Sequence, residues 1–208
     1  MGQGPSVIEC PFDAEVWSVN NGWIQVAKLN GHINKIFLAH KQVYKDGKAV
    51  FDWDSLNQLA DLGVEIFNTH RVKRLKSKLY PLKRIAEKFN CDYFSNTICY
   101  MLAYALDKGY RKIRLYGIDM RETGEYALEK GGIEYWMGRA HGMGIEITST
   151  ASSTLLKTVT YAPYGSKEFD PKTFVDGGRI IIGLDGRAYG KGDDKLRRTS
   201  DSNSKARQ

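Results

Sequence analysis

Four groups of polar residues in this chain are suited to binding a nucleotide if the apolar runs between them form a parallel sheet. These groups are the turn Gly2–Ser6 (which includes Gln3, Gly4 and Ser6), the pair Asn20 and Asn21, the pair Asn96 and Thr97, and the single residue Asp119. Glycines let ribose or phosphate approach the backbone, carboxamides donate to and accept from a base, and a threonine at a helix start suits a phosphate. Each group follows a predicted strand or begins a predicted helix, where open α/β sheets bind ligands. The pattern therefore predicts one nucleotide site built from separated segments.

A second group contains residue types that transfer protons or stabilise negative charge. Asp119, Tyr126 and His141 are the candidate catalytic residues, and Arg121 and Arg139 are candidates for holding phosphate. The alternative is that the second arginine forms an exposed ion pair and that the histidine lies in a loop or in the core. Mg²⁺ bound by Asp119 together with the phosphates of a nucleotide is the one cofactor that this set suggests.

The sequence lacks the signatures of several other kinds of site. Cys10, Cys91 and Cys99 are widely spaced without a CxxC pair, which argues against a disulfide framework and a zinc site and favours reduced thiols. The histidines have no HxxxH or HxH spacing, so we predict no metal site built from protein ligands alone. There is no GxxxxGK[ST] loop, no GxSxG elbow and no complete GxGxxG fingerprint.

Alternating strands and helices must position these residues. The apolar runs typical of buried strands are Glu15 to Val19, Ile36 to Ala39, Val64 to Asn68, Ile113 to Ile118 and Ile145 to Thr148. The predicted helices follow a cap at Asp52 or Asp54, begin near Pro81, run from Asn96 to a stop at Gly109, and extend weakly over Ile133 to Met143. This order is typical of a doubly wound, mostly parallel Rossmann-like α/β sheet.

Composition divides the chain into three parts. Residues 1–160 are predicted to form the nucleotide-binding domain, and residues 161–190 a C-terminal extension with a hairpin at Asp185 and Gly186. Residues 191–208 are basic and polar, so we expect them to be disordered. Only Met1 precedes the turn Gly2–Ser6, so either the fold manages without a strand there or the sequence begins one strand late.

The basic residues are concentrated in one segment and in the tail. The chain of 208 residues has a net charge of +7, and the range 71–88 holds eight basic residues against one acidic residue. This segment is either a solvated face or a surface for phosphates and nucleic acid. No apolar run is long enough to span a bilayer and no leader is recognisable, so we expect a cytoplasmic protein without a membrane partner; its oligomeric state is left open.

Three segments together resemble a known superfamily. Three segments, GQGPSV near the start, VWSVNN across the end of the first apolar run, and SNTICYMLAYALDKGYRKIRLYGIDM with Tyr126 shortly after it, resemble the MptE-like proteins and the related bacterial sialyltransferase-like Rossmann proteins. That superfamily includes pterin pyrophosphokinases, motility accessory factors and uncharacterised phage proteins. The resemblance covers about Gly2 to Leu156 and implies a nucleotide-binding transferase, in the bacterial host cytoplasm if the protein is encoded by a phage.

The resemblance implies roles for particular residues. It places Gln3, Gly4 and Ser6 near ribose or phosphates, Asn20 and Asn21 on the nucleotide, Asn96 and Thr97 at the phosphates, Gly117 and Asp119 beside the base or sugar, and Tyr126 at the departing phosphate. The sialyltransferases also use a histidine in a loop beyond that tyrosine, and His141 does not match its position. The sequence therefore predicts a transferase of glycosyl or diphosphate groups, with a non-catalytic nucleotide-binding or nucleic-acid-binding protein as the alternative.

Overall fold

The computed structural model describes residues 1–39, 44–45, 48–120, 125–156, 181–182 and 188–189. The chain divides into two units, Met1–Leu155 and Leu156–Gln208. In the second unit the strands β9 (Ile181–Ile182) and β10 (Ala188–Tyr189) pair antiparallel. The turn predicted between these strands and the predicted disordered tail lie outside the described residues. The elements described below belong to the first unit.

The first unit is a mixed α/β structure built on a parallel sheet. The four strands of this sheet, in spatial order, are β1 (Trp17–Val19), β2 (Lys35–Leu38), β5 (Glu65–Asn68) and β6 (Lys78–Leu79). A separate antiparallel pair consists of β3 (Tyr44–Lys45) and β4 (Lys48–Ala49). In the parallel sheet Ser18 lies opposite Ile36, which lies opposite Ile66. The first three predicted strands are therefore confirmed as neighbours.

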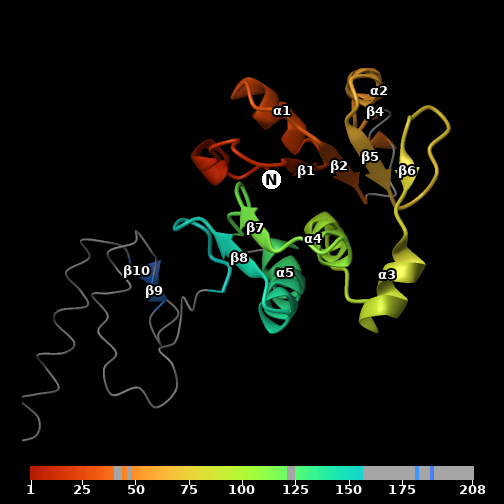
Figure 1. The fold of residues 1–208 in the computed structure, drawn as a ribbon. Helices are drawn as coiled ribbons and strands as arrows, with labels where there is room; N and C mark the ends of the chain where they lie inside the picture. The colour runs from red at the N-terminus through yellow and green to blue at the C-terminus, as the bar shows by residue number, and fades with distance from the viewer. Residues whose placement is uncertain (40–43, 46–47, 121–124, 157–180, 183–187, 190–208) are drawn as a thin grey trace, which may run out of the picture. The chain divides into compact units, whose positions relative to one another are not determined.

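Helices cover both faces of this sheet (Figure 1). The helices are the 3₁₀ helix η1 (Pro5–Glu9), α1 (Gly22–Lys28), α2 (Trp53–Asp61), α3 (Leu82–Phe89), α4 (Thr97–Asp107) and α5 (Glu125–Gly142). Phe37 of β2 packs with Tyr104 of α4, whereas the adjacent Ile36 packs in the cluster of Leu56 from α2. Because successive residues of a strand point to opposite faces, β2 is buried on both sides, as a central parallel strand requires.

A second pair of parallel strands lies beyond β1. The N-terminus lies between β1 and this pair (Figure 1). The pair consists of β7 (Lys112–Leu115) and β8 (Glu146–Ser149). On one side the amine of Met1 donates to the carbonyl of Trp17 at 2.6 Å, and the N–H of Val19 donates to the carbonyl of Met1 at 3.2 Å. On the other side the N–H of Gly2 donates to the carbonyl of Tyr116 at 2.9 Å. The first residues therefore bond like a strand to both β1 and β7.

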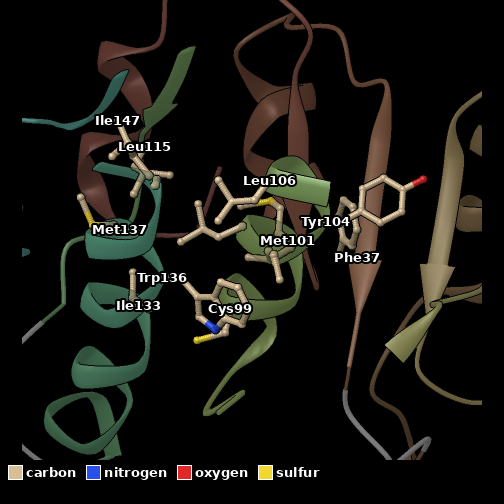
Figure 2. Packing of buried hydrophobic residues seen from close by; sticks show 14 of the residues in the cluster. Phe37, Cys99, Met101, Tyr104, Leu106, Leu115, Ile133, Trp136, Met137 and Ile147 are labelled. Atoms are coloured by element: carbon tan, nitrogen blue, oxygen red, sulfur yellow. The ribbon is translucent and has the colours of Figure 1, made fainter. Parts of the chain in front are cut away.

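Helix α4 is the centre of the main hydrophobic core (Figure 2). Asn96 caps it by accepting a hydrogen bond from the N–H of Cys99 at 3.1 Å, and Gly109 follows its end at a φ of 77°. Leu102 is 2% exposed and Trp136 of α5 is fully buried. Burying a leucine side chain contributes about 2 kcal/mol. The capped, apolar helix predicted from the sequence is confirmed.

Two helices differ from the expectation. Helix α1 was not predicted, because its seven residues bury only Gly22 and Val26 and carry little periodic signal. Helix α5 begins at Glu125 rather than at Ile133. Its glycines suggested a weak helix, but a Cβ on Gly132 would lie 2.1 Å from the hydroxyl of Ser95. That glycine permits close packing of α5 against the start of α4.

Candidate functional site

The turn at the N-terminus is held in place by Asp119, which lies beyond the end of β7. The N–H of Ser6 donates to Oδ2 of Asp119 at 2.7 Å, and the Ser6 hydroxyl donates to Oδ1. The same hydroxyl accepts a buried hydrogen bond from the N–H of Gly117 at 2.9 Å. Both carboxylate oxygens of Asp119 are thus hydrogen-bonded to the turn that begins the chain, and the turn and the strand end form one rigid edge.

Glycine is needed where these two segments approach each other. A Cβ on Gly4 would lie 2.6 Å from Oδ2 of Asp119, closer than side chains tolerate. Gly117 has a φ of 67°, and a Cβ there would lie 2.9 Å from the carbonyl of Gly2. Glycine at these two positions therefore lets the turn pack directly against the end of β7.

Asn20 and the start of α4 form the neighbouring edge. Asn20 has a φ of 49°, in the left-handed region that asparagine tolerates, and its N–H donates to the carbonyl of Phe37 at 2.9 Å. The buried hydroxyl of Thr97 donates to the Asn20 side chain oxygen at 3.3 Å. The side chain oxygen of Asn96 caps α4 by accepting a hydrogen bond from the N–H of Cys99. Asn20 and the start of α4 thus lie next to each other, as the prediction of converging polar groups required.

These segments surround a cavity of about 810 Å³. The predicted residues that line it are Gln3, Gly4, Asn20, Asn96, Thr97, Gly117 and Asp119. Ser6 lies behind this surface, bonded to Asp119. A cavity of this size holds a ligand as large as a nucleotide, since small-molecule sites occupy several hundred Å³.

Three further lining residues were not predicted from the sequence. Phe94 and Tyr100 stack with ring centroids 4.7 Å apart, and Glu129 comes from α5. Burial raises the pKa of the Tyr100 phenol, so its hydroxyl stays a proton donor at neutral pH. Tyr100 follows Asn96 by four residues, which places the two side chains on one face of α4 and is a signal that the sequence offered.

The charge of the described lining is negative. Asp119 and Glu129 contribute carboxylates, and the described lining contains no lysine, arginine or histidine. The side chain nitrogen of Asn96 lies 3.5 Å from Oε2 of Glu129, so the amide and the carboxylate meet at the start of α4. A phosphate in this cavity would need a positive charge from another source, such as a bound cation.

Several other predicted residues lie away from the cavity lining. The side chain nitrogen of Asn21 donates to the carbonyl of Val50 at 3.2 Å. Arg139 lies over the ring of Phe89, 5.3 Å from its centroid. His141 is exposed near the end of α5, with Nε2 at 3.4 Å from the carbonyl of Ile147.

The position of the remaining predicted residues is described only in part. Tyr126 lies in α5, but its side chain is outside the described residues. Arg121 is also outside them. The three cysteines are free thiols, and burial raises the pKa of Cys99, which keeps it a poor nucleophile.

Ion pairs neutralise much of the basic segment 71–88. The pairs are Lys76 with Asp61, Lys78 with Glu65, Arg84 and Lys88 with Asp107, and Lys83 with Glu87. Five of the eight basic residues thus have a carboxylate partner within the fold. Phosphates of a nucleic acid would have to compete with these carboxylates, which lowers the gain from binding there.

Clusters of three or more histidine, cysteine, aspartate or glutamate side chains that could hold a metal ion are absent from the described part of the chain. Within the same residues, no helix has the length and apolarity needed to cross a membrane. No protein-family model matches the chain, and neither a curated protein nor a solved structure matches it.

Proposed function

We propose that the cavity binds a nucleotide or nucleotide-sugar and that the first unit is a Rossmann-like domain of the MptE-like and sialyltransferase-like kind. One observation carries the proposal. Asn20 after β1, the start of α4, and the turn that Asp119 holds after β7 converge on one cavity at the carboxyl ends of parallel strands. That edge is where open α/β sheets bind nucleotides.

The chemistry of the lining suits the parts of such a ligand. The half-buried backbone of Gly4 lines the cavity, where a ribose or phosphate can contact it, and Asn20 offers a carboxamide to a base or ribose. The start of α4 at Thr97 supplies N–H groups and the positive end of the helix dipole for a phosphate. The stacked pair Phe94 and Tyr100 offers a planar apolar wall for a base.

Mg²⁺ is the cation that fits the negative lining best. A carboxylate has about four acceptor positions, and Ser6 uses two of those on Asp119, so each oxygen keeps room for one further contact. Magnesium bound to nucleotide phosphates often takes only one or two protein carboxylates. In this proposal Mg²⁺ arrives with the nucleotide, and Arg121 adds a second positive charge.

The proposed reaction is transfer of the glycosyl or diphosphate part of the bound molecule to an acceptor. The protein would contribute mainly position and charge, by fixing the phosphates against α4 while the acceptor occupies the rest of the cavity. Tyr126 is the proposed aid to the departing phosphate. His141 is left out of this proposal, because it lies outside the cavity lining.

A ligand panel followed by one matched pair of variants tests binding. Nucleotides and nucleotide-sugars, with and without Mg²⁺, are screened for a rise in Tm, and the best ligand is measured by titration calorimetry. Asn20→Gly keeps the left-handed backbone and removes the carboxamide, so we expect about three- to tenfold weaker binding. Asn30→Gly is the control, since Asn30 has a φ of 53° and lies outside the cavity lining. Equal affinities for the two variants, or no ligand in the panel, would refute the proposal.

The transfer step has its own test. The best nucleotide-sugar is incubated with the protein and with a panel of candidate acceptors, so that the glycosyl group passes to an acceptor or to water, and the released nucleoside phosphate is followed by chromatography. Release above the background rate supports a transferase. Tight binding without any release supports instead the non-catalytic nucleotide-binding protein.

A further inference from the structure

The side chains of Asn96 and Glu129 form a short row of hydrogen-bonding groups at the cavity. Helices α4 and α5 pack side by side (Figure 1), and Asn96 at the start of α4 meets Glu129 of α5. Both residues line the cavity. The Nδ2 atom of Asn96 lies 3.5 Å from Oε2 of Glu129, and Oε1 is the second oxygen of the same carboxylate. The Asn96–Glu129 row is therefore donor, acceptor, acceptor in that order.

Contacts within the protein fix the direction of this row. The side chain oxygen of Asn96 accepts from the N–H of Cys99, so the amide nitrogen is the end that faces Glu129. Nδ2 also lies 3.4 Å from the backbone carbonyl of Glu129, to which the hydroxyl of Ser95 donates at 3.1 Å. Because both contacts of Nδ2 are long, one of its hydrogens can serve them together and leave the other for a ligand. A carboxylate has about four acceptor positions, which leaves Glu129 the same capacity.

An aromatic wall lies beside the row. Tyr100 follows Asn96 by four residues and so lies on the same face of α4, and its ring stacks on that of Phe94. Both rings line the cavity. Proteins bind an unpaired base by stacking it on aromatic side chains and by hydrogen bonds to its Watson–Crick edge. The wall and the row supply both kinds of contact from neighbouring residues.

We propose that the Asn96–Glu129 row binds the Watson–Crick edge of guanine, so that the ligand of the cavity is a guanine nucleotide. Guanine presents the acceptor O6 and the donors N1–H and N2–H in that order, which pair with Nδ2, Oε2 and Oε1. Adenine and cytosine can pair with two of these three groups at most. Uracil would place its O2 acceptor against Oε1. Guanine alone among these bases matches the whole row.

This assignment fits the charge of the cavity lining. Asn96 contacts Glu129, whereas the next residue, Thr97, contacts Asn20. With the base at Glu129, the ribose and phosphates extend toward Thr97, Asn20 and Asp119. Glu129 then faces N–H donors of the base instead of a phosphate, which leaves Asp119 as the carboxylate that takes the Mg²⁺. The inference rests on the proposed nucleotide site and names the base that the site takes.

Four diphosphates test the choice of base. Binding of GDP, ADP, CDP and UDP to the full chain is measured by titration calorimetry with Mg²⁺. We expect GDP to bind about ten- to a hundredfold more tightly than the other three, since a bidentate contact discriminates between bases by about that factor. Preference for another base, or equal binding of all four, would overturn the guanine assignment and keep the nucleotide site. Binding of none of them would refute the nucleotide site and the assignment together.

Glu129→Gln tests the row itself. Glutamine turns it into donor, acceptor, donor, which opposes N2–H of guanine and matches all three groups of uracil. We expect the ratio of GDP affinity to UDP affinity to fall at least tenfold. This ratio is the readout because the lost charge acts on both diphosphates alike. An unchanged ratio would overturn the proposal.

Glu134→Gln is the matched control for this substitution. It removes one carboxylate from the same helix, but Glu134 pairs with Lys130 and is not among the described residues that line the cavity. We expect its ratio of GDP affinity to UDP affinity to stay within about twofold of that of the parent chain. A fall as large as that for Glu129→Gln would show that the charge of α5 sets the preference, and would overturn recognition by the row.

Discussion

Asp119 holds Ser6 through both oxygens of its carboxylate, across 113 residues of sequence. One contact is to the backbone N–H at 2.7 Å and the other is to the hydroxyl. The contact joins the first turn of the chain to the end of β7 and closes one side of the cavity. A substitution at Asp119 would therefore disturb this turn as well as any ligand contact, which makes Asn20 the cleaner probe of binding.

Ser6→Ala should destabilise the fold. The hydroxyl donates to Asp119 and accepts from the buried N–H of Gly117, so its removal leaves a buried donor without its partner. We expect the free energy of unfolding to fall by about 1–3 kcal/mol in urea denaturation. Ser152→Ala is the control, because Ser152 is exposed and its contacts to Thr150 and Glu9 are long, at 3.2 and 3.4 Å, and we expect a change within about 0.5 kcal/mol. Equal losses for both variants would show that the Ser6 contacts contribute little.

Gly117→Ala should cost more than Gly144→Ala. Both glycines have positive φ, 67° and 69°, so alanine is strained in the backbone to a similar degree at each. Only at Gly117 would the Cβ meet another backbone atom, the carbonyl of Gly2 at 2.9 Å, whereas nothing lies within 4 Å at Gly144. We expect about 1–2 kcal/mol for Gly144→Ala and at least 1 kcal/mol more for Gly117→Ala, measured as urea midpoints. Identical midpoints would contradict the close approach of the first turn to β7.

The strands and α4 could be predicted because their signals are local. Short apolar runs mark the buried strands, and Asn96 and Gly109 mark the ends of α4 in the sequence itself. The convergence of these segments followed from one rule, that parallel strands deliver their carboxyl ends to one edge. That rule placed Asn20, Thr97 and Asp119 at the same cavity.

The finer assignments depended on contacts that no local pattern records. Asn20 and Asn21 are adjacent, yet the left-handed backbone of Asn20 keeps it at the cavity while Asn21 bonds to Val50. His141 lies on the same helix as Glu129, but twelve residues are about 18 Å of helix, so only Glu129 reaches the cavity. The sequence prediction began this helix at Ile133, after Glu129, and so did not place Glu129 on α5.

Asp107→Asn should destabilise the chain more than Asp61→Asn. The Asp107 side chain is 2% exposed and pairs with Arg84 at 2.6 Å and Lys88 at 3.0 Å, joining the end of α4 to α3. Its hydrogen bond from Arg84 lowers the pKa of Asp107, so its contribution is present at neutral pH and is lost as pH falls below about 4. We expect a loss of about 1–3 kcal/mol at pH 7, against less than 1 kcal/mol for the exposed Asp61 pair. The difference should shrink in denaturation experiments at pH 3, and a difference that does not change with pH would contradict this account.

The buried amine of Met1 should make stability rise with pH between 5 and 8. Burial lowers its pKa from 8.0 to about 5, with a smaller opposing effect of Cys10. In that interval the unfolded chain binds a proton that the folded chain does not, so unfolding is favoured as pH falls, by at most about 1.4 kcal/mol per pH unit. An N-acetylated chain carries every other titrating group but not the amine, so subtracting its urea stability at each pH isolates this contribution. Parallel curves for the two chains would show that the amine keeps its ordinary pKa, and hence that the position of Met1 between β1 and β7 is open to water.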